Sequence, residues 1–262
     1  MKTSQKIILI VLAALSIGAV VIFSVFNVKL SADDTTNVLL TDVIQRAILS
    51  AFLVMVMLCS PEFSRLLVPT KPNKGYLLII PCIFVALANF PFFALIKGTA
   101  QINRIDLLWL FLLQCLFVGT IEELFFRAIL QKIVFDKLQG KSIFLKVIVS
   151  SAIFGLWHLV NLFFGGGIGA TLLQVGYSFL IGAMLSGLML VTNNIWLAVV
   201  VHALFDVGGT IVTYLGVGNF QDLGFWILTC ACGFICFVCV LITLIRLDKQ
   251  QNAKNKSEGL PN

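Results

Sequence analysis

The stretch Thr120-Ile121-Glu122-Glu123-Leu124-Phe125-Phe126-Arg127 closes a long apolar run and sets two carboxylates beside an arginine. Ionisable side chains are rare within membrane-spanning helices and usually mark a function there. On a helix, Glu123 and Arg127 are i,i+4 neighbours in the order that favours an ion pair. Glu122 lies about 100° further around the helix and faces elsewhere. The stretch therefore predicts one carboxylate paired for structural support and one left free for chemistry.

The rest of the chain is apolar enough to require a membrane. Of its 262 residues, 60% are hydrophobic and 11% are charged, whereas soluble domains carry about 25% charged residues. Repeated apolar runs of about 20 residues predict an all-α, polytopic membrane protein. We expect one integral membrane domain, 1–262, with a charged cytoplasmic tail, 246–262. Its eight predicted spans lie at about 7–26, 43–60, 76–96, 105–127, 147–164, 170–191, 195–215 and 225–245.

Particular residues refine the second and third spans. Arg46 falls near the outer end of the second predicted span, where its side chain can reach the interface. Pro81 and Pro91 are expected to kink the third span, because proline removes a backbone donor and clashes with the preceding turn.

The distribution of charge predicts the orientation. With the N-terminus inside, the predicted inner segments hold 14 of the 18 lysines and arginines and the outer ends hold 4. The positive-inside rule then places both termini in the cytoplasm. The net charge of +6 reflects this topology, so we expect the lipid bilayer, and no nucleic acid, as a partner.

Four ionisable side chains inside the predicted spans are the candidates for chemistry. The two histidines of the chain are His158, in the fifth span, and His202, in the seventh. His202 and Asp206 are i,i+4 and share a helix face, and Glu122 comes from the fourth span. Neighbouring antiparallel helices could bring the four groups together in the bundle interior. At about 1.5 Å per residue, Glu122 and the histidines lie roughly 7–17 Å from the cytoplasmic ends of their spans.

Several chemistries fit these four residues. A free carboxylate can act as a general base on water, with a neutral imidazole sharing that water. His202, oriented or assisted by Asp206, could stabilise the oxyanion of a tetrahedral intermediate. The four groups could instead bind zinc, form hydrogen bonds between helices, or serve a proton or cation pathway. The residue pattern alone leaves these alternatives open.

Three motifs in order resemble the CAAX-protease and bacteriocin-processing (CPBP, or Abi) family of intramembrane endopeptidases. They are Glu-Glu-x-x-x-Arg beginning at Glu122, Phe-x-x-x-His beginning at Phe154, and His-x-x-x-Asn/Asp beginning at His202. The resemblance covers about 107–216. It implies an endopeptidase site whose roles are water activation by Glu122 and His158, structural pairing of Glu123 with Arg127, packing by Phe154, and oxyanion stabilisation by His202 and Asp206.

One residue departs from the family pattern. Asp206 stands where the prenyl-protein proteases of the family have asparagine, and an ionised aspartate cannot donate a hydrogen bond. We therefore expect Asp206 to orient His202 or to bind a metal. The family has been described both as glutamate-dependent and as metal-dependent, so the expected cofactor is either none or zinc.

The resemblance and the compact loops together imply a multi-pass protein of a bacterial plasma membrane. Its expected substrate is a peptide or a membrane-protein segment that is not prenylated. The first alternative is a non-catalytic bacteriocin immunity or scaffold protein. The second is a proton-coupled transporter, which predicts further polar residues on a path to both faces; the sequence offers few candidates, namely Gln174, Tyr177 and Asp106.

Overall fold

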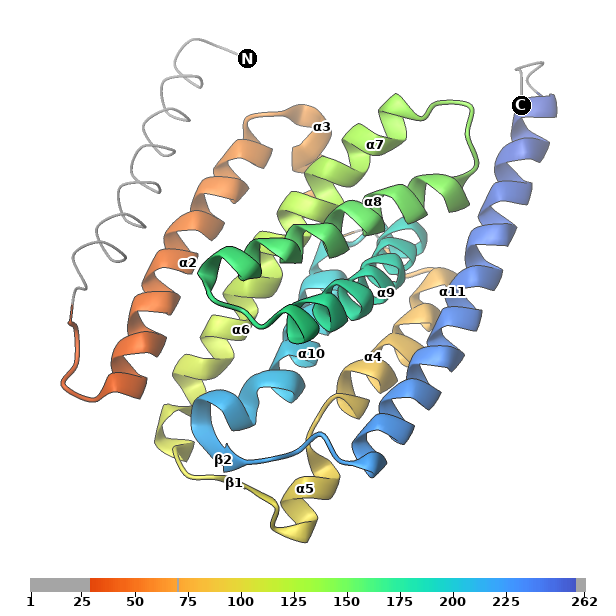
Figure 1. Ribbon diagram of the computed structural model, residues 1–262. Helices are drawn as coiled ribbons and strands as arrows, with labels where there is room; N and C mark the ends of the chain where they lie inside the picture. The colour runs from red at the N-terminus through yellow and green to blue at the C-terminus, as the bar shows by residue number, and fades with distance from the viewer. Residues whose placement is uncertain (1–28, 70, 258–262) are drawn as a thin grey trace.

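The computed structural model describes residues 29–69 and 71–257. Within that part of the chain, seven helical segments are long and apolar enough to cross a membrane, at 34–58, 74–97, 105–137, 143–164, 168–192, 195–215 and 223–253. The protein is an all-α, multi-pass bundle, as predicted (Figure 1). The predicted first span, 7–26, lies outside the described residues.

The elements of the described chain follow a simple order. They are α2 (Asp34–Leu58), α3 (Pro61–Ser64), η1 (Arg65–Leu67), η2 (Lys74–Leu78), α4 (Ile79–Ala88), α5 (Phe92–Lys97), β1 (Ala100–Ile102), η3 (Ile105–Leu107), α6 (Leu108–Glu122), η4 (Glu123–Leu130), α7 (Gln131–Lys137), α8 (Ile143–Trp157), η5 (His158–Phe164), α9 (Ile168–Thr192), α10 (Ile195–Leu215), β2 (Gly216–Gly218) and α11 (Leu223–Ser257).

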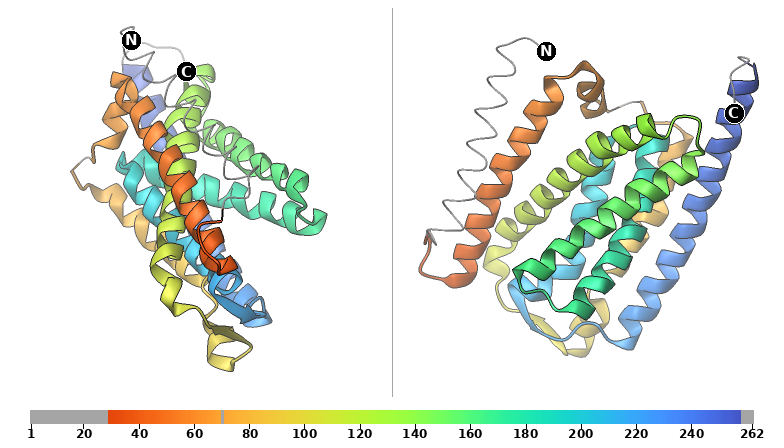
Figure 2. Two further views of the ribbon diagram at one scale, coloured as in Figure 1. Left: turned by 90° about the vertical axis from the view of Figure 1, so that its left-hand side faces the viewer. Right: turned by 45° about the horizontal axis from the view of Figure 1, so that its top comes forward.

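The long helices enclose a common interior. α6 packs against α2 and α10, and α4 packs against α10 and α11, while α9 contacts α8, α10 and α11. The hairpin of α8 and α9 crosses one face of the other helices (Figure 1) and projects from the bundle in the left view of Figure 2. As a result, α6, α10 and the α8–α9 hairpin face one another inside the bundle.

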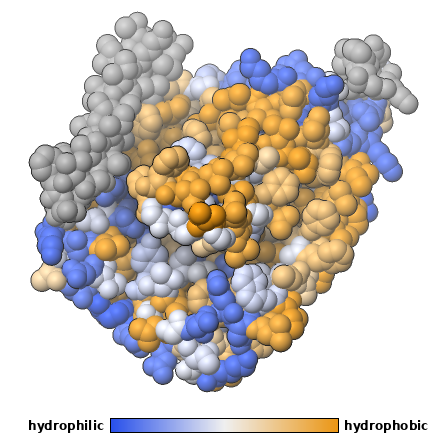
Figure 3. All heavy atoms as spheres, viewed as in Figure 1, coloured by the Kyte–Doolittle hydropathy of each residue, from blue (hydrophilic) through white to orange (hydrophobic). Residues whose placement is uncertain are grey.

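The outer surface suits a lipid environment. Figure 3 shows apolar side chains over much of one face, and polar side chains near its ends and in a hollow below the α8–α9 hairpin. Large apolar side chains such as Phe84, Trp109 and Phe234 are more than half exposed. Hydrocarbon chains can cover such side chains, because the helices satisfy their own backbone hydrogen bonds.

The helix that carries Arg46 begins earlier than predicted. α2 starts at Asp34 rather than at about residue 43, because Asp33 caps it by accepting a hydrogen bond of 2.8 Å from the Thr36 backbone N–H. Arg46 therefore lies about 18 Å along the helix from its start. The prediction that Arg46 lies near the outer end of its span was wrong.

Only one of the two prolines in the third span interrupts it. α4 ends at Ala88 and Pro91 is the N-cap of α5, whereas Pro81 lies in the first turn of α4, where its missing N–H is tolerated. Asn89 fills the break and donates from Nδ2 to the Phe205 carbonyl of α10 at 2.8 Å. α10 approaches so closely here that a Cβ on Gly208 would lie 2.8 Å from the Asn89 carbonyl carbon.

The sequence suggested that the Glu-Glu-Arg stretch ends its span, but the helix continues beyond it. α6 continues into the π-helical segment η4 and then into α7, and π-helical turns are frequent at functional sites. One turn earlier, Gly119 allows α6 to approach α10. A Cβ at Gly119 would lie 3.0 Å from the Val199 carbonyl oxygen and 3.5 Å from the His202 Cβ. This close contact places the glutamates beside His202.

A small sheet closes the end of the bundle opposite the C-terminal end of α11 (Figure 1). Its antiparallel register pairs Ala100 with Gly218, Gln101 with Val217 and Ile102 with Gly216. Near it, Lys97 pairs with Asp222 at 2.6 Å and Arg104 with Asp33 at 3.0 Å. The side-chain and backbone hydrogen bonds from Thr36, followed by that from Arg104, lower the pKa of Asp33 to about 2.

Candidate active site

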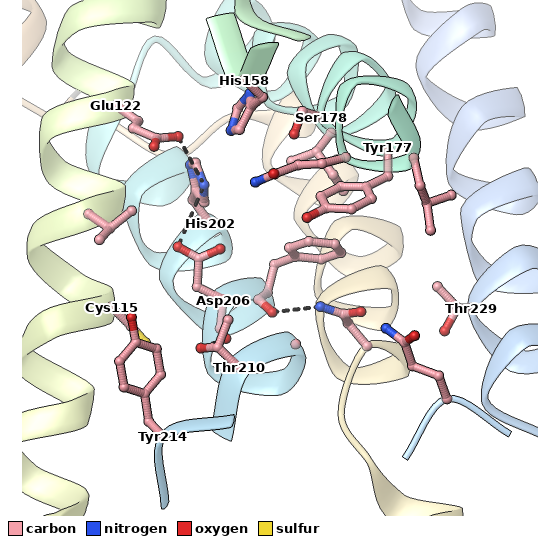
Figure 4. A pocket seen from close by; sticks show the side chains of 18 of the residues that line it. Cys115, Glu122, His158, Tyr177, Ser178, His202, Asp206, Thr210, Tyr214 and Thr229 are labelled. Atoms are coloured by element: carbon pink, nitrogen blue, oxygen red, sulfur yellow. Dashed lines mark hydrogen bonds and ion pairs between the residues drawn. The ribbon is translucent and has the colours of Figure 1, made fainter. Parts of the chain in front are cut away.

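The four polar residues from the predicted spans line one cavity of about 310 Å³. Glu122 ends α6, His158 follows α8, and His202 and Asp206 lie on α10. Figure 4 shows Glu122, His158 and His202 near one another at one end of the cavity. Asp206 lies beside His202, on the side away from Glu122 and His158. The fold thus brings together side chains that are up to 84 positions apart in the sequence (122 to 206).

His202 lies between three carboxylates. Its Nδ1 is 2.7 Å from Glu123 Oε1, which is hydrogen-bond distance. Its Nε2 is 3.6 Å from Glu122 Oε2 and 3.8 Å from Asp206 Oδ2, both beyond a direct hydrogen bond. The contact that fixes the ring therefore comes from Glu123. Asp206, which the sequence suggested for this role, faces the other ring nitrogen.

Glu123 also belongs to a packed cluster with Arg127 and Phe154. Glu123 Oε2 lies 3.3 Å from Arg127 Nε, and neither side chain has any exposed surface. The guanidinium carbon of Arg127 lies 4.3 Å from the centre of the Phe154 ring, a cation–π contact that offsets part of the cost of burying the charge. Glu123 thus connects Arg127 to His202. The spacing of residues along one helix could not predict the contact with His202, which lies on another helix.

The hydrogen bond of His158 defines its tautomer. His158 Nδ1 lies 3.0 Å from the Phe154 carbonyl oxygen. Because a carbonyl only accepts, Nδ1 must carry the hydrogen, and in the neutral ring Nε2 is then an acceptor. The Phe154 ring packs edge-to-face against both histidines, with centroid distances of 5.1 Å to His158 and 6.1 Å to His202.

Exposure separates the polar groups of the site into two kinds. The side chains of Glu122 and Asp206 are 22% and 24% exposed, whereas those of Glu123 and Arg127 are fully buried. The first two can meet water or a ligand from the cavity. Neither carboxylate lies within direct hydrogen-bond distance of His202 Nε2, and His202 lines the cavity, so this nitrogen can form a hydrogen bond with such a molecule.

A zinc site requires several donor side chains close to one point. In the part of the chain that the structure describes, no group of three or more histidine, cysteine, aspartate or glutamate side chains is arranged to hold a metal ion. Glu122, His158, His202 and Asp206 have suitable donor atoms, but their present positions do not fit the zinc alternative.

The cavity extends beyond these four residues to side chains that the sequence had not indicated. Arg46, Gln114 and Asn89 line it, and each comes from a different helix or helix break. For Arg46 the sequence contains one signal, the i,i+4 spacing of Asp42 and Arg46, which predicts an ion pair within α2.

The fold and the site define a multi-pass membrane protein with a carboxylate–imidazole cavity inside a helical bundle. Residues 104–208 match the family model described as "Type II CAAX prenyl endopeptidase Rce1-like". The matched segment contains Glu122, His158, His202 and Asp206. The segment 104–208 is therefore an Rce1-like domain of the CAAX-protease and bacteriocin-processing family, whose members are intramembrane proteases. Comparisons with curated proteins and with solved structures gave no match.

Proposed function

We propose that this protein is an intramembrane endopeptidase that cleaves a peptide or a membrane-protein segment with water activated by Glu122 and His158. The observation that carries the proposal is that four polar side chains from three spans line one cavity. The match of 104–208 to a family of intramembrane proteases supports the class of reaction. The partial exposure of Glu122 toward the cavity supports its role as the reacting carboxylate.

In the proposed reaction, a water molecule lies between the Glu122 carboxylate and His158 Nε2. Glu122 takes one proton from the water as its oxygen attacks the carbonyl carbon of the substrate. The protonated Glu122 then gives that proton to the leaving amine as the C–N bond breaks. Water and the peptide supply every atom of the products, and a positioned general base typically contributes about 10²–10⁴-fold to the rate.

His202 is proposed to stabilise the negative charge that develops on the carbonyl oxygen. Both of its ring nitrogens face carboxylates, which accept hydrogen bonds and do not donate them when ionised. The ring therefore serves as a donor on each side, and Nε2 can donate to the oxyanion. Asp206 supports His202 as an acceptor, which removes the need for a donor at position 206.

The packed cluster of Glu123, Arg127 and Phe154 is proposed to hold these groups in place. Glu123 accepts from His202 Nδ1 and pairs with Arg127, so both ends of its carboxylate are engaged. Removing one member of a buried ion pair costs about 3–5 kcal/mol, because the remaining charge is left without a partner. The cluster is therefore a positioning device rather than a reacting group.

We further propose that the site lies in the cytoplasmic half of a bacterial plasma membrane. At about 1.5 Å per residue, Glu122 is about 21 Å from the start of α6, and His202 is about 10 Å from the start of α10. With the orientation predicted from charge, α6 enters from the outer side and α10 from the inner side. In a hydrocarbon core about 30 Å thick, both groups then have similar depth.

The test is cleavage of a pool of N-acylated peptides by the purified full-length protein in proteoliposomes. We expect cleavage that persists with a chelator and is lost in Glu122→Ala. Glu62→Ala is the matched control, because Glu62 is an exposed glutamate that pairs with Lys132 at 3.4 Å. Cleavage by Glu122→Ala at the wild-type rate would overturn the proposal. Stoichiometric zinc with chelator-sensitive cleavage would replace the metal-free reaction with a zinc-dependent one.

One observation favours the transporter alternative as a second candidate. The cavity wall contains Asn89, Gln114 and Thr210, so it is more polar than the sequence had indicated. A transporter predicts Glu122-dependent proton flux into proteoliposomes with no cleavage of the peptide pool. An immunity or scaffold protein predicts neither activity.

A further inference from the structure

The cavity continues past the proposed catalytic groups to a cation that the proposed reaction does not use. In Figure 4, Cys115 and Tyr214 lie at the end of the cavity away from Glu122 and His158. Arg46 and Gln114, which both contact Asp42, also line the cavity. Arg46 comes from α2, which precedes the segment 104–208 matched by the family model.

Arg46 is held by a small polar network. Its Nη1 lies 2.7 Å from Asp42 Oδ2, one helical turn earlier. The same Asp42 oxygen accepts a hydrogen bond of 3.1 Å from Gln114 Nε2. The Arg46 and Asp42 side chains are 29% and 26% exposed, and Arg46 is the member of the pair that lines the cavity.

The network leaves donor capacity toward the cavity. A guanidinium carries five N–H donors in a planar fork that matches a carboxylate. Asp42 is the carboxylate that pairs with Arg46 among the described residues, and it shares its oxygen with Gln114. Asp42 can therefore fix the direction of Arg46 while other N–H groups remain for a ligand.

A charged arginine near the middle of a spanning helix is costly and usually serves a function when it faces an interior cavity. We propose that Arg46 binds a carboxylate of the peptide substrate and thereby sets where the substrate is cut. The inference rests on the endopeptidase function proposed above. Asp42 and Gln114 are positioning residues in this scheme, because they act through Arg46.

The structure also gives the expected spacing between this carboxylate and the scissile bond. Gln114 marks the position of Arg46, because both side chains contact the same Asp42 oxygen. Gln114 and Glu122 are eight residues apart on α6, which is about 12 Å along the axis. An extended peptide spans at most about 3.3–3.6 Å per residue. The carboxylate should therefore lie about three or four residues from the bond that is cut. It can belong to an acidic side chain or to a free C-terminus.

The test separates binding from cleavage. The probes are N-myristoylated ten-residue peptides that carry one aspartate at successive positions, each matched to the asparagine peptide. Every peptide is made as a free acid and as a C-terminal amide. Binding is measured on full-length protein that carries Glu122→Gln, so that no probe is consumed. Cleavage positions are mapped by mass spectrometry with Glu122 intact.

The decisive variant replaces both members of the Asp42–Arg46 ion pair at once. Asp42→Asn with Arg46→Gln avoids an unpaired Asp42 inside the bundle, and Arg46→Lys keeps the charge without the fork. Arg104→Gln is the matched control, because Arg104 pairs with Asp33 and Asp106 near the small sheet.

We expect one carboxylate position to bind about 10- to 100-fold more tightly than its neutral counterpart, as charge-assisted hydrogen bonds imply. The double variant should lose this preference, Arg46→Lys should keep part of it, and Arg104→Gln should keep all of it. Equal binding of charged and neutral probes to the Glu122→Gln protein, or an unchanged preference in the double variant, would overturn the inference. Failure of the endopeptidase proposal would instead appear as no cleavage by protein with Glu122 intact, whatever the binding result.

Discussion

The two neighbouring glutamates of the central motif lie in opposite environments. Glu123 has no exposed surface and is engaged by both Arg127 and His202. Glu122 is 22% exposed, faces the cavity, and approaches His202 Nε2 only to 3.6 Å. Two identical side chains on one helix thus differ in accessibility and in the number of partners. The immediate surroundings therefore differ as expected if Glu123 has the proposed structural role and Glu122 the proposed reacting role.

The largest expected effect on stability comes from replacing Glu123, the buried member of the two glutamates. Glu123→Ala should lower the free energy of unfolding by about 3–5 kcal/mol, because it leaves Arg127 buried without its partner. Glu122→Ala should change it little. The measurement is the yield and thermal unfolding of both variants in the same detergent. Equal losses in the two variants would remove the distinction between the glutamates.

A smaller effect is expected where α10 meets the break in the third span. Gly208→Ala should destabilise the fold by about 1–3 kcal/mol, because its Cβ would lie 2.8 Å from the Asn89 backbone. Gly176→Ala on α9 is the matched control, since nothing lies within 4 Å of its added Cβ and alanine favours helix. Thermal unfolding should fall for the first variant and stay level or rise for the second. The opposite order would show that this contact does not fix α10.

The smallest effect concerns a carboxylate outside the spans. Asp33 has a pKa of about 2 in the folded protein, below its usual value of 3.8. Its contribution to stability is therefore fully present above about pH 4 and is lost as the pH falls toward 2. Asp33→Asn should reduce the acid dependence of unfolding in this window, while changing peptide cleavage at neutral pH very little. An identical acid profile in both proteins would contradict this role.

The sequence predicted the architecture because membrane spans are recorded locally in apolar runs. Each of the seven spans in the described residues overlaps a predicted one. Arg46 was misplaced because the polar residues that begin α2 look like a loop when apolar runs alone are counted. The helix includes these polar residues because the Asp33 side chain caps it by accepting a hydrogen bond from the Thr36 backbone N–H.

The site was only partly predictable, because spacing along one helix does not give the rotation of one helix against another. The i,i+4 rule gives the pairing of Glu123 with Arg127. The contact of Glu123 with His202 depends on how closely α6 and α10 approach at Gly119. The π-helical turn η4 and the place of Arg46 in the cavity wall likewise require the assembled bundle.

The most direct test of the division between the two glutamates is the cleavage rate per folded molecule. Glu122→Gln and Glu123→Gln proteins would be purified as monodisperse fractions and compared with wild type on the same cleaved peptide. We predict that Glu122→Gln keeps the fold and loses at least about 10²-fold in rate. The Glu123→Gln protein that does fold should retain much more activity. Wild-type rates in folded Glu122→Gln, or a greater loss per folded molecule in Glu123→Gln, would contradict the account.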